Sequence, residues 1–516
     1  MYPIHRYMVD RFFQIMGRIA GYFNTENTGI DPGAIFREMK SRGNYDALIC
    51  TKDEVLSFSS GLEIPDISSD GSLITFFDPA MVPAMTPSMM DLSLSAEDII
   101  TVCDTDLYNW KHLSESYGND VAGAIRNNAD LLVLFLEILF KKVAADKLNE
   151  SDTLSFLDTS LRQLRGVYAF GCKVDDKVYL ARDLIGVKPL WYDLSRGLAF
   201  ASEKKFLEKA GCREVKELSP RQILCYDLED NTITLHDREF LSELTEVEGS
   251  EDDVRDELLK LLKDAVSVRV PDDNFGVMFS GGIDSTILAS ICKEVAEAKG
   301  VSVTCYTVGL SGVASSPDII CAKRIAEELG FELKVHEIDL EAVEEHLKVV
   351  VPLIEDASVP KTGVAMTMYA ASVAAKKDGI NVLFAGAGAD ELFAGYNRYK
   401  QSGNINQDCL KDILEMHEVN TYRDDTVAAF TGTVLRLPYL DEKFVEYSLA
   451  IPEKFKMSDD MNKVILRRAG EELGLPEAIT KRSKKAAQYG SRFDQALKKL
   501  AKRAGFSNKT EYINSF

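Results

Sequence analysis

Two short segments that contain glycine and aspartate carry the side chains in this sequence best suited to phosphate chemistry. The first, residues 280–285 (SGGIDS), follows the apolar run 275–279 and precedes a stretch with helical periodicity. Glycine lets a backbone approach an anion closely, and the first N–H groups of a helix attract negative charge. Asp284 would repel a polyphosphate unless a cation lay between them, which predicts Mg²⁺ at this loop. We therefore expect a phosphate-binding loop; the alternative is a Gly-Gly turn whose aspartate only caps the helix.

The second segment, residues 386–391 (GAGADE), follows the apolar run 381–385. Gly386 and Gly388 again permit close approach of a nucleotide. Asp390 can share Mg²⁺ with Asp284 if both segments lie at one edge of a sheet. The alternative is an ordinary turn, since Gly and Asp are common where strands end. Phe393 and Tyr396, which follow, are expected to be core residues.

The elements that must position these two segments alternate along the second half of the chain. Apolar β-type runs at 275–279, 301–308, 333–338 and 381–385 are separated by helical patterns at about 285–299, 317–329 and 366–377. Such alternation is typical of a parallel sheet with helices on both faces, whose ligands bind at the carboxyl ends of the strands. We therefore predict that the two segments form two walls of one pocket.

The first half of the chain has a different pattern. Short β-type runs at 166–172, 178–181 and 197–201 are separated by turns, and one long helical pattern spans 129–143. This mixture indicates an α+β domain. Between about 237 and 253 the chain becomes acidic and loses its apolar periodicity, which is typical of a linker. From Val254 onward an amphipathic helix is expected to lead into the second domain.

Composition disfavours several classes of protein. The 516 residues include 82 acidic and 60 basic side chains, and the net charge of -22 repels nucleic acid and anionic lipid. No apolar run approaches the ~20 residues that cross a bilayer, and the amino terminus lacks the apolar stretch of a secretory signal. Nine cysteines without a CxxC pair suit reduced thiols, so we expect a cytoplasmic protein. The first loop also lacks the Gly-Lys-Ser/Thr ending of a Walker loop, which disfavours a kinase or an NTPase.

The motif SGGxDS after a strand resembles the pyrophosphate loop of the N-type ATP pyrophosphatases, and the chain resembles the glutamine-dependent asparagine synthetases over residues 16–495. The other segments that carry the resemblance are 182–190 (RDLIGVKPL), 200–203 (FASE), 316–318 (SPD), 388–393 (GADELF) and 436–441 (RLPYLD). The resemblance implies an extension at 1–15, an α+β N-terminal-nucleophile (αββα) glutaminase-like domain at 16–236 and a linker at 237–253. It implies an α/β parallel-sheet ATP-pyrophosphatase (adenine nucleotide α-hydrolase-like) domain at 254–516.

The resemblance also implies a role for each residue of the site, with ATP and Mg²⁺ as cofactors. The residues that would hold pyrophosphate are Ser280, Gly281, Gly282 and Ser285, and those that would hold Mg²⁺ are Asp284 and Asp390. The residues that would line the rest of the nucleotide are Met278, Val308, Ala385, Gly386 and Gly388. Arg436 and Lys484 would contact phosphate and stabilise the charged transition state. Lys485 is a rival to Lys484, and a basic cluster near a carboxyl terminus is otherwise typical of solvated surface.

The amino-terminal half departs from the family at the residues that free ammonia from glutamine. The family uses a cysteine directly after the initiator methionine; here Gly17 stands at that position, and a free amine beside it would require Met16 to be the start. The glutamine-holding motif NGEIYN appears as DTDLYN at 104–109. Neither Cys50 nor Cys103 lies at a matching position, and Arg42 and Asp130 are expected to support structure. Because covalent chemistry needs an activated nucleophile, we predict no glutaminase activity.

A second departure concerns the amine. The acidic residue that the family places between the two glycines of the second segment, thought to assist amide formation, is Ala387 here. Alanine cannot move a proton, so another group does that work or the nucleophile differs. With 423–425 (RDD) and 485–491 (KAAQYGS), the chain looks closest to the asparagine synthetase domain-containing subgroup.

Three functions stay open at this point. In the first, ATP and a carboxylate, aspartate by analogy, form an acyl adenylate and pyrophosphate, and ammonia then attacks to form an amide. The second is a ligase for another carboxylate and amine, like the β-lactam synthetases, whose residue at the position of Ala387 is tyrosine. The third is a non-catalytic nucleotide-binding regulatory protein. The expected partners are small-molecule substrates, without nucleic acid or membrane, and a homodimer is left open.

Overall fold

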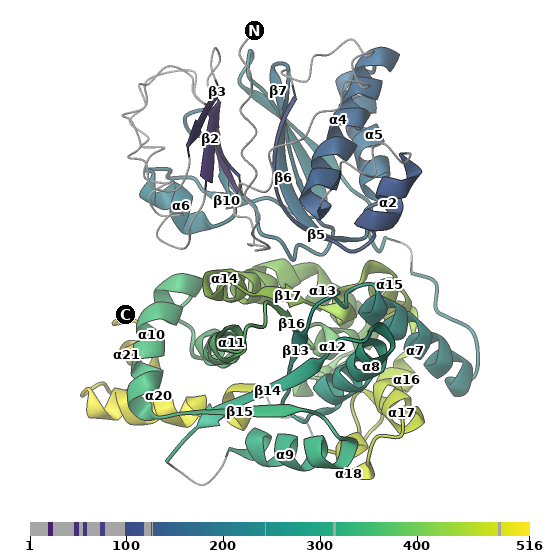
Figure 1. Cartoon of the computed structure of the whole chain (residues 1–516), viewed down its shortest axis with the longest axis vertical. Helices are drawn as coiled ribbons and strands as arrows, with labels where there is room; N and C mark the ends of the chain where they lie inside the picture. Colours follow the sequence, from purple (N-terminus) through teal and green to yellow (C-terminus); the bar gives the residue numbers. More distant parts are fainter. Residues whose placement is uncertain are drawn as a thin grey trace.

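The computed structural model describes residues 19–23, 46–50, 55–58, 73–77, 99–117, 125, 127–242, 244–312, 316–482 and 487–516. Two units lie one above the other (Figure 1), the first built on antiparallel sheets and the second on one parallel sheet. The last strand of the first unit ends at Asp237, and the first helix of the second begins at Glu251. That helix has a capping box, in which Ser250 and Asp253 each bond to the other's backbone N–H.

The first unit contains three antiparallel sheets. The five-stranded sheet has the order β12-β11-β7-β6-β5 and comprises β5 (Ile99–Leu107), β6 (Gly166–Val174), β7 (Lys177–Arg182), β11 (Gln222–Asp227) and β12 (Thr232–Asp237). The four-stranded sheet has the order β1-β9-β8-β10 and comprises β1 (Ala20–Phe23), β8 (Trp191–Asp193), β9 (Leu198–Ala201) and β10 (Lys216–Glu217). The three-stranded sheet has the order β3-β2-β4 and comprises β2 (Asp46–Cys50), β3 (Val55–Phe58) and β4 (Leu73–Phe77).

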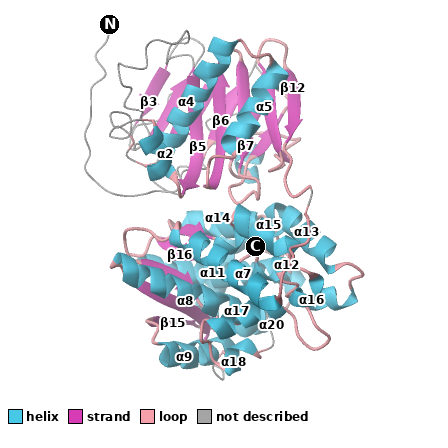
Figure 2. Ribbon diagram, turned by 90° about the vertical axis from the view of Figure 1, so that its right-hand side faces the viewer, coloured by secondary structure: helices cyan, strands magenta, loops and turns pink. Residues whose placement is uncertain are grey.

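The five-stranded sheet is covered on both faces. Helices α2 (Trp110–Ser116), α4 (Asn128–Asp146) and α5 (Glu150–Leu161) lie on one face (Figure 2), where Leu132, Leu136 and Tyr168 belong to one buried cluster. The other face packs against the four-stranded sheet through residues such as Leu180 and Phe200. A helical layer and two packed sheets are therefore present, as the expected α+β class requires. A short helix, α6 (Lys204–Lys209), follows β9.

The second unit is built on a parallel sheet with the order β15-β14-β13-β16-β17. Its strands are β13 (Phe275–Met278), β14 (Val303–Leu310), β15 (Leu333–Ile338), β16 (Val382–Phe384) and β17 (Val434–Arg436). Phe275 and Val277 on β13 are fully buried, as expected for a strand covered on both faces. The strand order reverses between β13 and its neighbours β14 and β16, which is where ligands bind in open α/β sheets.

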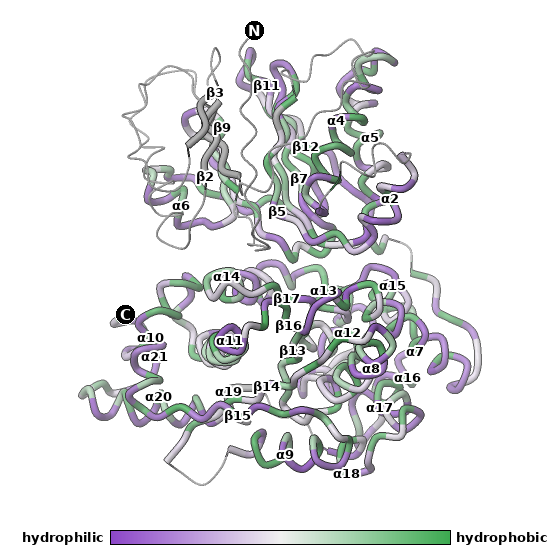
Figure 3. Tube along the Cα trace, viewed as in Figure 1, coloured by the Kyte–Doolittle hydropathy of each residue, from purple (hydrophilic) through white to green (hydrophobic). Residues whose placement is uncertain are grey.

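Helices cover both faces of this sheet. They are α7 (Glu251–Ser267), α8 (Ile283–Lys299), α9 (Pro317–Leu329), α10 (Leu340–Ile354), α11 (Val359–Lys377), α12 (Ala389–Leu392), α13 (Ile405–Met416), α14 (Tyr422–Thr431), α15 (Glu442–Ala450), α16 (Glu453–Lys456), α17 (Val464–Glu472), α18 (Glu477–Thr480), α19 (Ala487–Gly490), α20 (Phe493–Arg503) and α21 (Lys509–Ile513), with 3₁₀ turns η4 (Asn397–Gln401) and η6 (Pro438–Leu440) and a π-helical turn η5 (His417–Thr421). Outer helices such as α9 and α20 alternate hydrophilic and hydrophobic residues (Figure 3). No described helix combines the length and the apolar character needed to span a bilayer.

The predicted elements of the second unit are present, with small shifts at their ends. The helix predicted at 317–329 and the strand predicted at 333–338 have the observed bounds of α9 and β15. Helix α11 begins at Val359, before the predicted start at 366. The sequence reasoning did not predict α10 or β17, and β17 has only three residues. The parallel sheet itself is confirmed.

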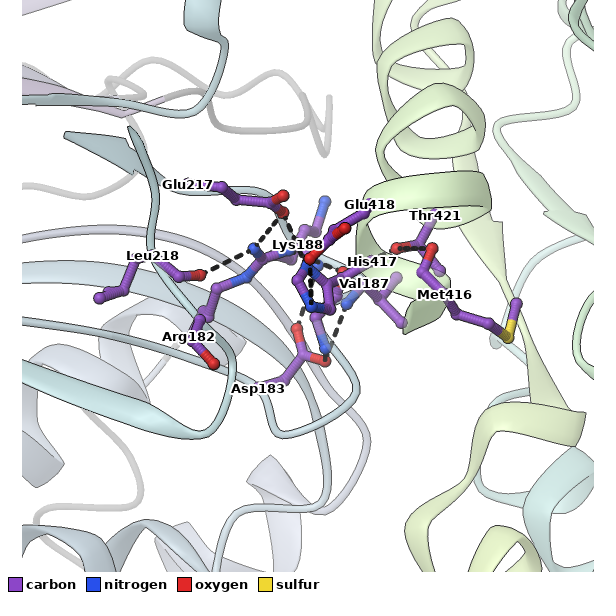
Figure 4. Close-up of polar contacts among 12 residues, drawn as sticks. Arg182, Asp183, Val187, Lys188, Glu217, Leu218, Met416, His417, Glu418 and Thr421 are labelled. Carbon is purple, nitrogen blue, oxygen red and sulfur yellow. Dashed lines mark hydrogen bonds and ion pairs between the residues drawn. The ribbon is translucent and has the colours of Figure 1, made fainter. Parts of the chain in front are cut away.

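The two units are joined by a polar contact that centres on the segment 182–190 (Figure 4). Arg182 is fully buried and donates to Glu217 and to the carbonyl of Gly186, each at 2.7 Å. From η5 in the second unit, His417 Nδ1 lies 3.1 Å from the same Glu217 carboxylate. Thr421 donates to the Gly186 carbonyl at 2.8 Å. This part of the family-like sequence therefore holds the units together.

Candidate active site

The loop at 280–285, which is predicted to bind phosphate, lies between β13 and α8. Its Ser280 N–H donates to the Ser285 hydroxyl at 3.3 Å, and Ser285 donates to the Gly282 carbonyl at 3.2 Å. Gly281 has a φ of +67°, and a Cβ there would lie 3.0 Å from the backbone nitrogen of Ala322. Glycine is required at this point for both its conformation and its size. The loop forms a compact turn at the amino end of a helix of 17 residues.

The second segment lies directly beside the first because β13 and β16 are paired in parallel, with Val277 opposite Phe384. A Cβ on Gly386 would lie 3.4 Å from the Cβ of Asp284. Gly388 has a φ of +95°, and a Cβ there would lie 2.4 Å from Leu440 Cδ2. The prediction that the two segments face each other agrees with this geometry.

Asp284 and Asp390, one from each segment, meet on a buried lysine. The ammonium nitrogen of Lys463 lies 2.7 Å from both carboxylate oxygens of Asp284 and 2.6 Å from Oδ1 of Asp390. Only 1% of Lys463 is exposed. Burial by itself would lower the pKa of Lys463, but the two aspartates outweigh it and raise the pKa above its ordinary value. The lysine therefore stays charged and holds the two loops together.

This pair of carboxylates is the donor set expected for a magnesium ion that arrives with a polyphosphate. Mg²⁺ usually binds one or two protein carboxylates and completes its shell with phosphate oxygens and water. Within the part of the chain that the structure describes, no cluster of three or more side chains is suited to hold a metal ion. The residues present thus fit a metal that is shared with a nucleotide, and they do not fit a metal held by the protein alone.

A cleft of about 880 Å³ adjoins this pair. Its lining residues are Pro317, Gly395, Tyr396, Asn397, Lys400, Asp460, Met461, Asn462, Arg467, Lys481, Arg482, Tyr489, Arg492 and Gln495. Gly395 packs so closely against the pair that a Cβ there would lie 2.0 Å from Oδ1 of Asp390 and 2.5 Å from Cε of Lys463. Arg482 extends from the cleft to the carbonyl of Ser280, at 3.4 Å. The cleft therefore touches both the phosphate loop and the carboxylate pair.

The charge of the cleft is opposite to that of the chain. Five of its residues are cationic and one, Asp460, is anionic, whereas the whole chain carries a net charge of -22. A positive cleft on a negative protein concentrates an anionic ligand at one place. Its size lies within the range usual for small-molecule sites, roughly 300–1,000 Å³.

The predicted nucleotide-lining residues lie at the ends of adjacent strands. Met278 ends β13, Val308 lies near the end of β14, and Ala385 follows β16. Val308 and Ala385 are buried, and Met278 is partly buried. Because these side chains are short or apolar, we expect the backbone to make the polar contacts with a nucleotide at these positions. Lys484 and its rival Lys485 lie outside the described residues.

The hydrogen bonds of Arg436 run to the first unit and to Arg269, and its expected contact with phosphate stays a prediction. Its Nε and Nη2 donate to the two carboxylate oxygens of Asp106 in the first unit, at 2.8 and 2.9 Å. Its Nη1 donates to the carbonyl of Arg269, and its guanidinium lies 5.6 Å from the ring centre of Tyr108. Only 7% of Arg436 is exposed. A bidentate carboxylate is the geometry that a planar guanidinium prefers, so Arg436 is committed to the contact between the units.

The degenerate glutamine motif at 104–109 supplies this contact. Asp104 forms an ion pair with Lys188 at 2.9 Å. Lys188 also pairs with Asp425 of the second unit at 3.1 Å. The ring of Tyr108 lies 4.3 Å from the guanidinium of Arg269. Side chains that would face glutamine in the family are thus used to bind the second unit.

The structure offers no activated thiol among the cysteines whose side chains it describes. All eight are buried, and none forms a disulfide. Burial raises the pKa of the Cys103 thiol well above its ordinary value, and Asp104 adds to the effect. Asp130 lies in the first turn of α4, which is capped by Asn127. Gly17 and Arg42 lie outside the described residues, as does the side chain of Cys50.

Sequence reasoning missed two residues of the site. Lys463 lies far along the chain from both aspartates. Its backbone φ of +58°, directly before α17, is unusual for a lysine, but it cannot be read from the sequence. Tyr396 was expected in the core with Phe393. Phe393 is fully buried, but Tyr396 is partly exposed and lines the cleft. A tyrosine that follows Gly395 next to an acidic pair could have marked it as a wall residue.

The comparisons with known proteins agree with this arrangement. Residues 89–209 match the model of a glutamine amidotransferase domain, and residues 257–407 and 400–514 match that of asparagine synthase. The chain is 31% identical to a Methanocaldococcus jannaschii protein assigned as asparagine synthetase (glutamine-hydrolyzing) 1, over 93% of each chain. It is 27% identical to asparagine synthetase B (glutamine-hydrolyzing) of Escherichia coli, over 82% of this chain and 76% of the relative. The human asparagine synthetase (glutamine-hydrolyzing) is 28% identical over 65% of each chain.

These relatives are named for a carbon–nitrogen ligase, and the matched regions lie in the order that the two units have here. The second unit contains a parallel sheet, and two aspartates that follow adjacent strands meet on one lysine. The chain therefore belongs to the asparagine synthase family. It is an enzyme of the carbon–nitrogen ligase type, in which a glutamine amidotransferase-like domain precedes a synthetase domain.

Proposed function

We propose that this protein activates a carboxylate, by analogy that of aspartate, by adenylation with ATP, releases pyrophosphate and then forms an amide with ammonia. The observation that carries the proposal is the meeting of Asp284 and Asp390, from two adjacent loops, on the single ammonium of Lys463. A charge arrangement of this kind at the carboxyl ends of β13 and β16 suits a magnesium–polyphosphate.

The residues of the phosphate loop bind the leaving pyrophosphate in this proposal. Backbone N–H groups at 280–285 and the hydroxyls of Ser280 and Ser285 donate to its oxygens, and the amino end of α8 favours its charge. Mg²⁺, when bound by Asp284 and Asp390 together with phosphate oxygens, supplies charge neutralisation at the leaving group. Lys463 and Lys484 offset the charge that develops as the carboxylate attacks the α-phosphate.

We propose ammonia rather than glutamine as the nitrogen source. Gly17 replaces the family's nucleophilic cysteine. Asp106, in the former glutamine motif, is held by Arg436 and is no longer available to a ligand. The purified protein should therefore release no glutamate from glutamine, and a measurable release would refute this part of the proposal.

The finer description of the fold belongs to the same proposal. We assign residues 1–15 to an extension, 16–236 to an αββα glutaminase-like domain, 237–253 to a linker and 254–516 to the synthetase domain. The packed pair of sheets and the helical layer on one of them support the αββα assignment. A cytoplasmic enzyme that acts on small molecules, as a monomer or a homodimer, accords with the acidic composition.

Exchange of labelled pyrophosphate into ATP tests the proposal directly, because exchange requires reversible adenylation but no amine. We expect exchange that depends on both aspartate and Mg²⁺. Exchange with another acid instead would identify a ligase of different specificity, as in the β-lactam synthetases. No exchange over a panel of carboxylic acids would leave a nucleotide-binding regulatory protein. The Asp252→Asn variant, which changes an exposed carboxylate on α7, provides a matched control.

A further inference from the structure

Tyr489 and Arg492 line one wall of the cleft, where α19 ends and α20 begins. Tyr489 is 59% exposed, a large fraction for an aromatic side chain, so protein does not close this wall. Ser491 and Phe493, on either side of Arg492, are almost completely buried. The two neighbours of Arg492 therefore belong to the core, whereas Arg492 itself borders the space that a ligand can enter.

This wall is fixed to the carboxyl end of β14. The N–H of Leu310, the last residue of β14, donates to the Ser491 carbonyl at 3.0 Å. Gly490 accepts a hydrogen bond from the Ser316 hydroxyl, and a Cβ on Gly490 would clash with the carboxylate of Asp318. In the sheet, β14 and β16 lie on opposite sides of β13. The wall therefore stands on the side of the first loop that is away from the strand preceding the second loop.

The stability of the fold does not explain an arginine at position 492. Its backbone φ is +67°, in the left-handed region that favours glycine. It is the residue directly before α20, where serine, threonine, aspartate or asparagine is preferred because the side chain accepts a helix N–H. The side chain of Arg492 makes no such bond, and a positive charge is unfavourable at the amino end of a helix. Strained positions of this kind are common at ligand sites.

The guanidinium of Arg492 also differs from those of the other two arginines of the cleft. Its Nε is buried and has no hydrogen-bond acceptor among the described residues. Arg467 donates to two backbone carbonyls, at 2.6 and 2.8 Å, and Arg482 pairs with the carboxylate of Asp318 at 3.2 Å. A buried donor without an acceptor costs free energy, which a ligand with a suitable acceptor would recover. Arg492 is thus the arginine of the cleft that needs an acceptor from outside the protein.

We infer that Arg492 binds a second carboxylate of the acid substrate, so that the protein selects dicarboxylic acids for adenylation. The inference rests on the proposed adenylation function. Nε and one Nη of a guanidinium form two parallel donors that match the two oxygens of a carboxylate. In the proposed reaction the loop at 280–285 and Mg²⁺ meet the charge of the phosphates, on the side of β13 and β16. Arg492, at the end of β14, remains for the anionic group of the acid that does not react.

The test compares aspartate with β-alanine in pyrophosphate exchange by the full-length protein, at saturating ATP and Mg²⁺. β-Alanine keeps the amine and the side-chain carboxylate of aspartate but lacks its α-carboxylate. The unchanged protein should have a KM for aspartate that is ~10–100-fold lower than its KM for β-alanine, as expected for a charged hydrogen-bonded pair. If another dicarboxylic acid supports exchange, the same acid without its second carboxylate takes the place of β-alanine.

Arg492→Gln should remove this preference. Its KM for aspartate should rise to about that for β-alanine, while the maximal exchange rate and the KM for ATP stay within about threefold, because the lost contact acts on binding alone. Arg492→Lys should give an intermediate KM for aspartate, since an ammonium keeps the charge but not the paired donors. Lys498→Gln changes an exposed cation of the same helix that does not line the cleft, and it should leave all of these values unchanged.

Arg492→Gly separates a role in binding from a role in the fold. Glycine adopts a φ of +67° without strain, so the unfolding temperature should be equal or higher, while the KM for aspartate rises as in Arg492→Gln. A lower unfolding temperature with an unchanged KM for aspartate would overturn the inference. A rise confined to the KM for ATP, or equal use of aspartate and β-alanine by the unchanged protein, would also overturn it and leave adenylation intact. No exchange with any acid would instead overturn the proposed adenylation, and this inference with it.

Discussion

Among the buried cations that pair with aspartate, Lys463 and Arg436 lie in surroundings that differ in one respect. At Lys463 one ammonium holds Asp284 and Asp390 beside a cleft of about 880 Å³. At Arg436 one guanidinium is held by Asp106, the Arg269 carbonyl and the Tyr108 ring between the two units. The first cluster borders a space that a ligand can enter, whereas the guanidinium of the second is surrounded by protein groups. Burial and charge alone therefore do not distinguish a reactive site from a structural contact.

The number of protein partners makes the distinction. Arg436 has its hydrogen-bond donors directed to one carboxylate and one carbonyl, so its charge is fully matched by protein. Lys463 balances two carboxylates with one positive charge, which leaves the cluster with one net negative charge. That net negative charge can attract the magnesium ion of a magnesium–polyphosphate, whereas the Arg436–Asp106 pair has no net charge to offer. Substitutions in the two clusters should therefore affect different measurements.

Arg436→Met should give the largest effect, on stability. Removal of one partner from a buried ion pair leaves Asp106 charged and uncompensated, which typically costs ~3–5 kcal/mol. Thermal unfolding should occur at a clearly lower temperature. The double variant Arg436→Met with Asp106→Leu should recover much of the loss and keep pyrophosphate exchange. A stable double variant without exchange would return Arg436 to a catalytic role.

Asp390→Asn should have the reverse signature. We expect pyrophosphate exchange to fall by ~10²–10³-fold, because one of the two charges that hold the magnesium–polyphosphate is lost. The unfolding temperature should change little, since Lys463 keeps Asp284 as a partner. Comparable loss of stability in both variants would remove the contrast between the clusters.

Glu442, at the start of α15, gives a smaller effect that depends on pH. Burial raises its pKa from 4.5 to about 7, and nearby Asp183 of the first unit contributes. Because the folded pKa lies above the unfolded one, the native state binds more protons, so stability falls as pH rises through that interval. The total is on the order of 3 kcal/mol, since each pKa unit corresponds to about 1.4 kcal/mol. Glu442→Gln should flatten the dependence of unfolding temperature on pH between 5 and 8, and an unchanged slope would contradict this assignment.

The smallest effect on stability is expected for an exposed ion pair between the two units. Lys111 pairs with Asp272 at 2.8 Å, but their side chains are 65% and 73% exposed. Exposed pairs contribute little, usually ~0–1 kcal/mol. Lys111→Ala should therefore shift the unfolding temperature by no more than about 2 °C in a protein of this size. A larger shift would show that an exposed pair at the edge of the contact contributes as much to stability as Arg436 does.

The sequence predicted the elements better than it predicted their partners. Alternation of apolar runs and helical patterns placed four of the five strands of the parallel sheet, and the order strand, glycine loop, helix located the loop at 280–285. Because both loops follow neighbouring strands, their meeting could also be predicted. The first unit's packed sheets agree with the predicted α+β mixture.

Long-range partners could not be predicted in the same way. Lys463 meets Asp284 across 179 residues, and Arg436 meets Asp106 across 330. Hydrophobic periodicity reports which face of an element is buried, but it does not report which distant charge a carboxylate will find. Family resemblance predicts a contact of Arg436 with phosphate, but it does not predict the ion pair that Arg436 forms with Asp106 of the first unit.

Gly186 shows how closely the two halves depend on each other. Its φ is +78°, and a Cβ there would lie 2.5 Å from Pro220 Cγ and 2.7 Å from His417 Cβ. Even the methyl group of an alanine would clash with both residues, and it would push the two units apart. A fragment that begins near residue 254 would remove Asp106 from Arg436 and Arg165 from Asp441, and it should unfold at a lower temperature than the full chain. The amino-terminal half therefore stabilises the second unit through its side-chain contacts alone.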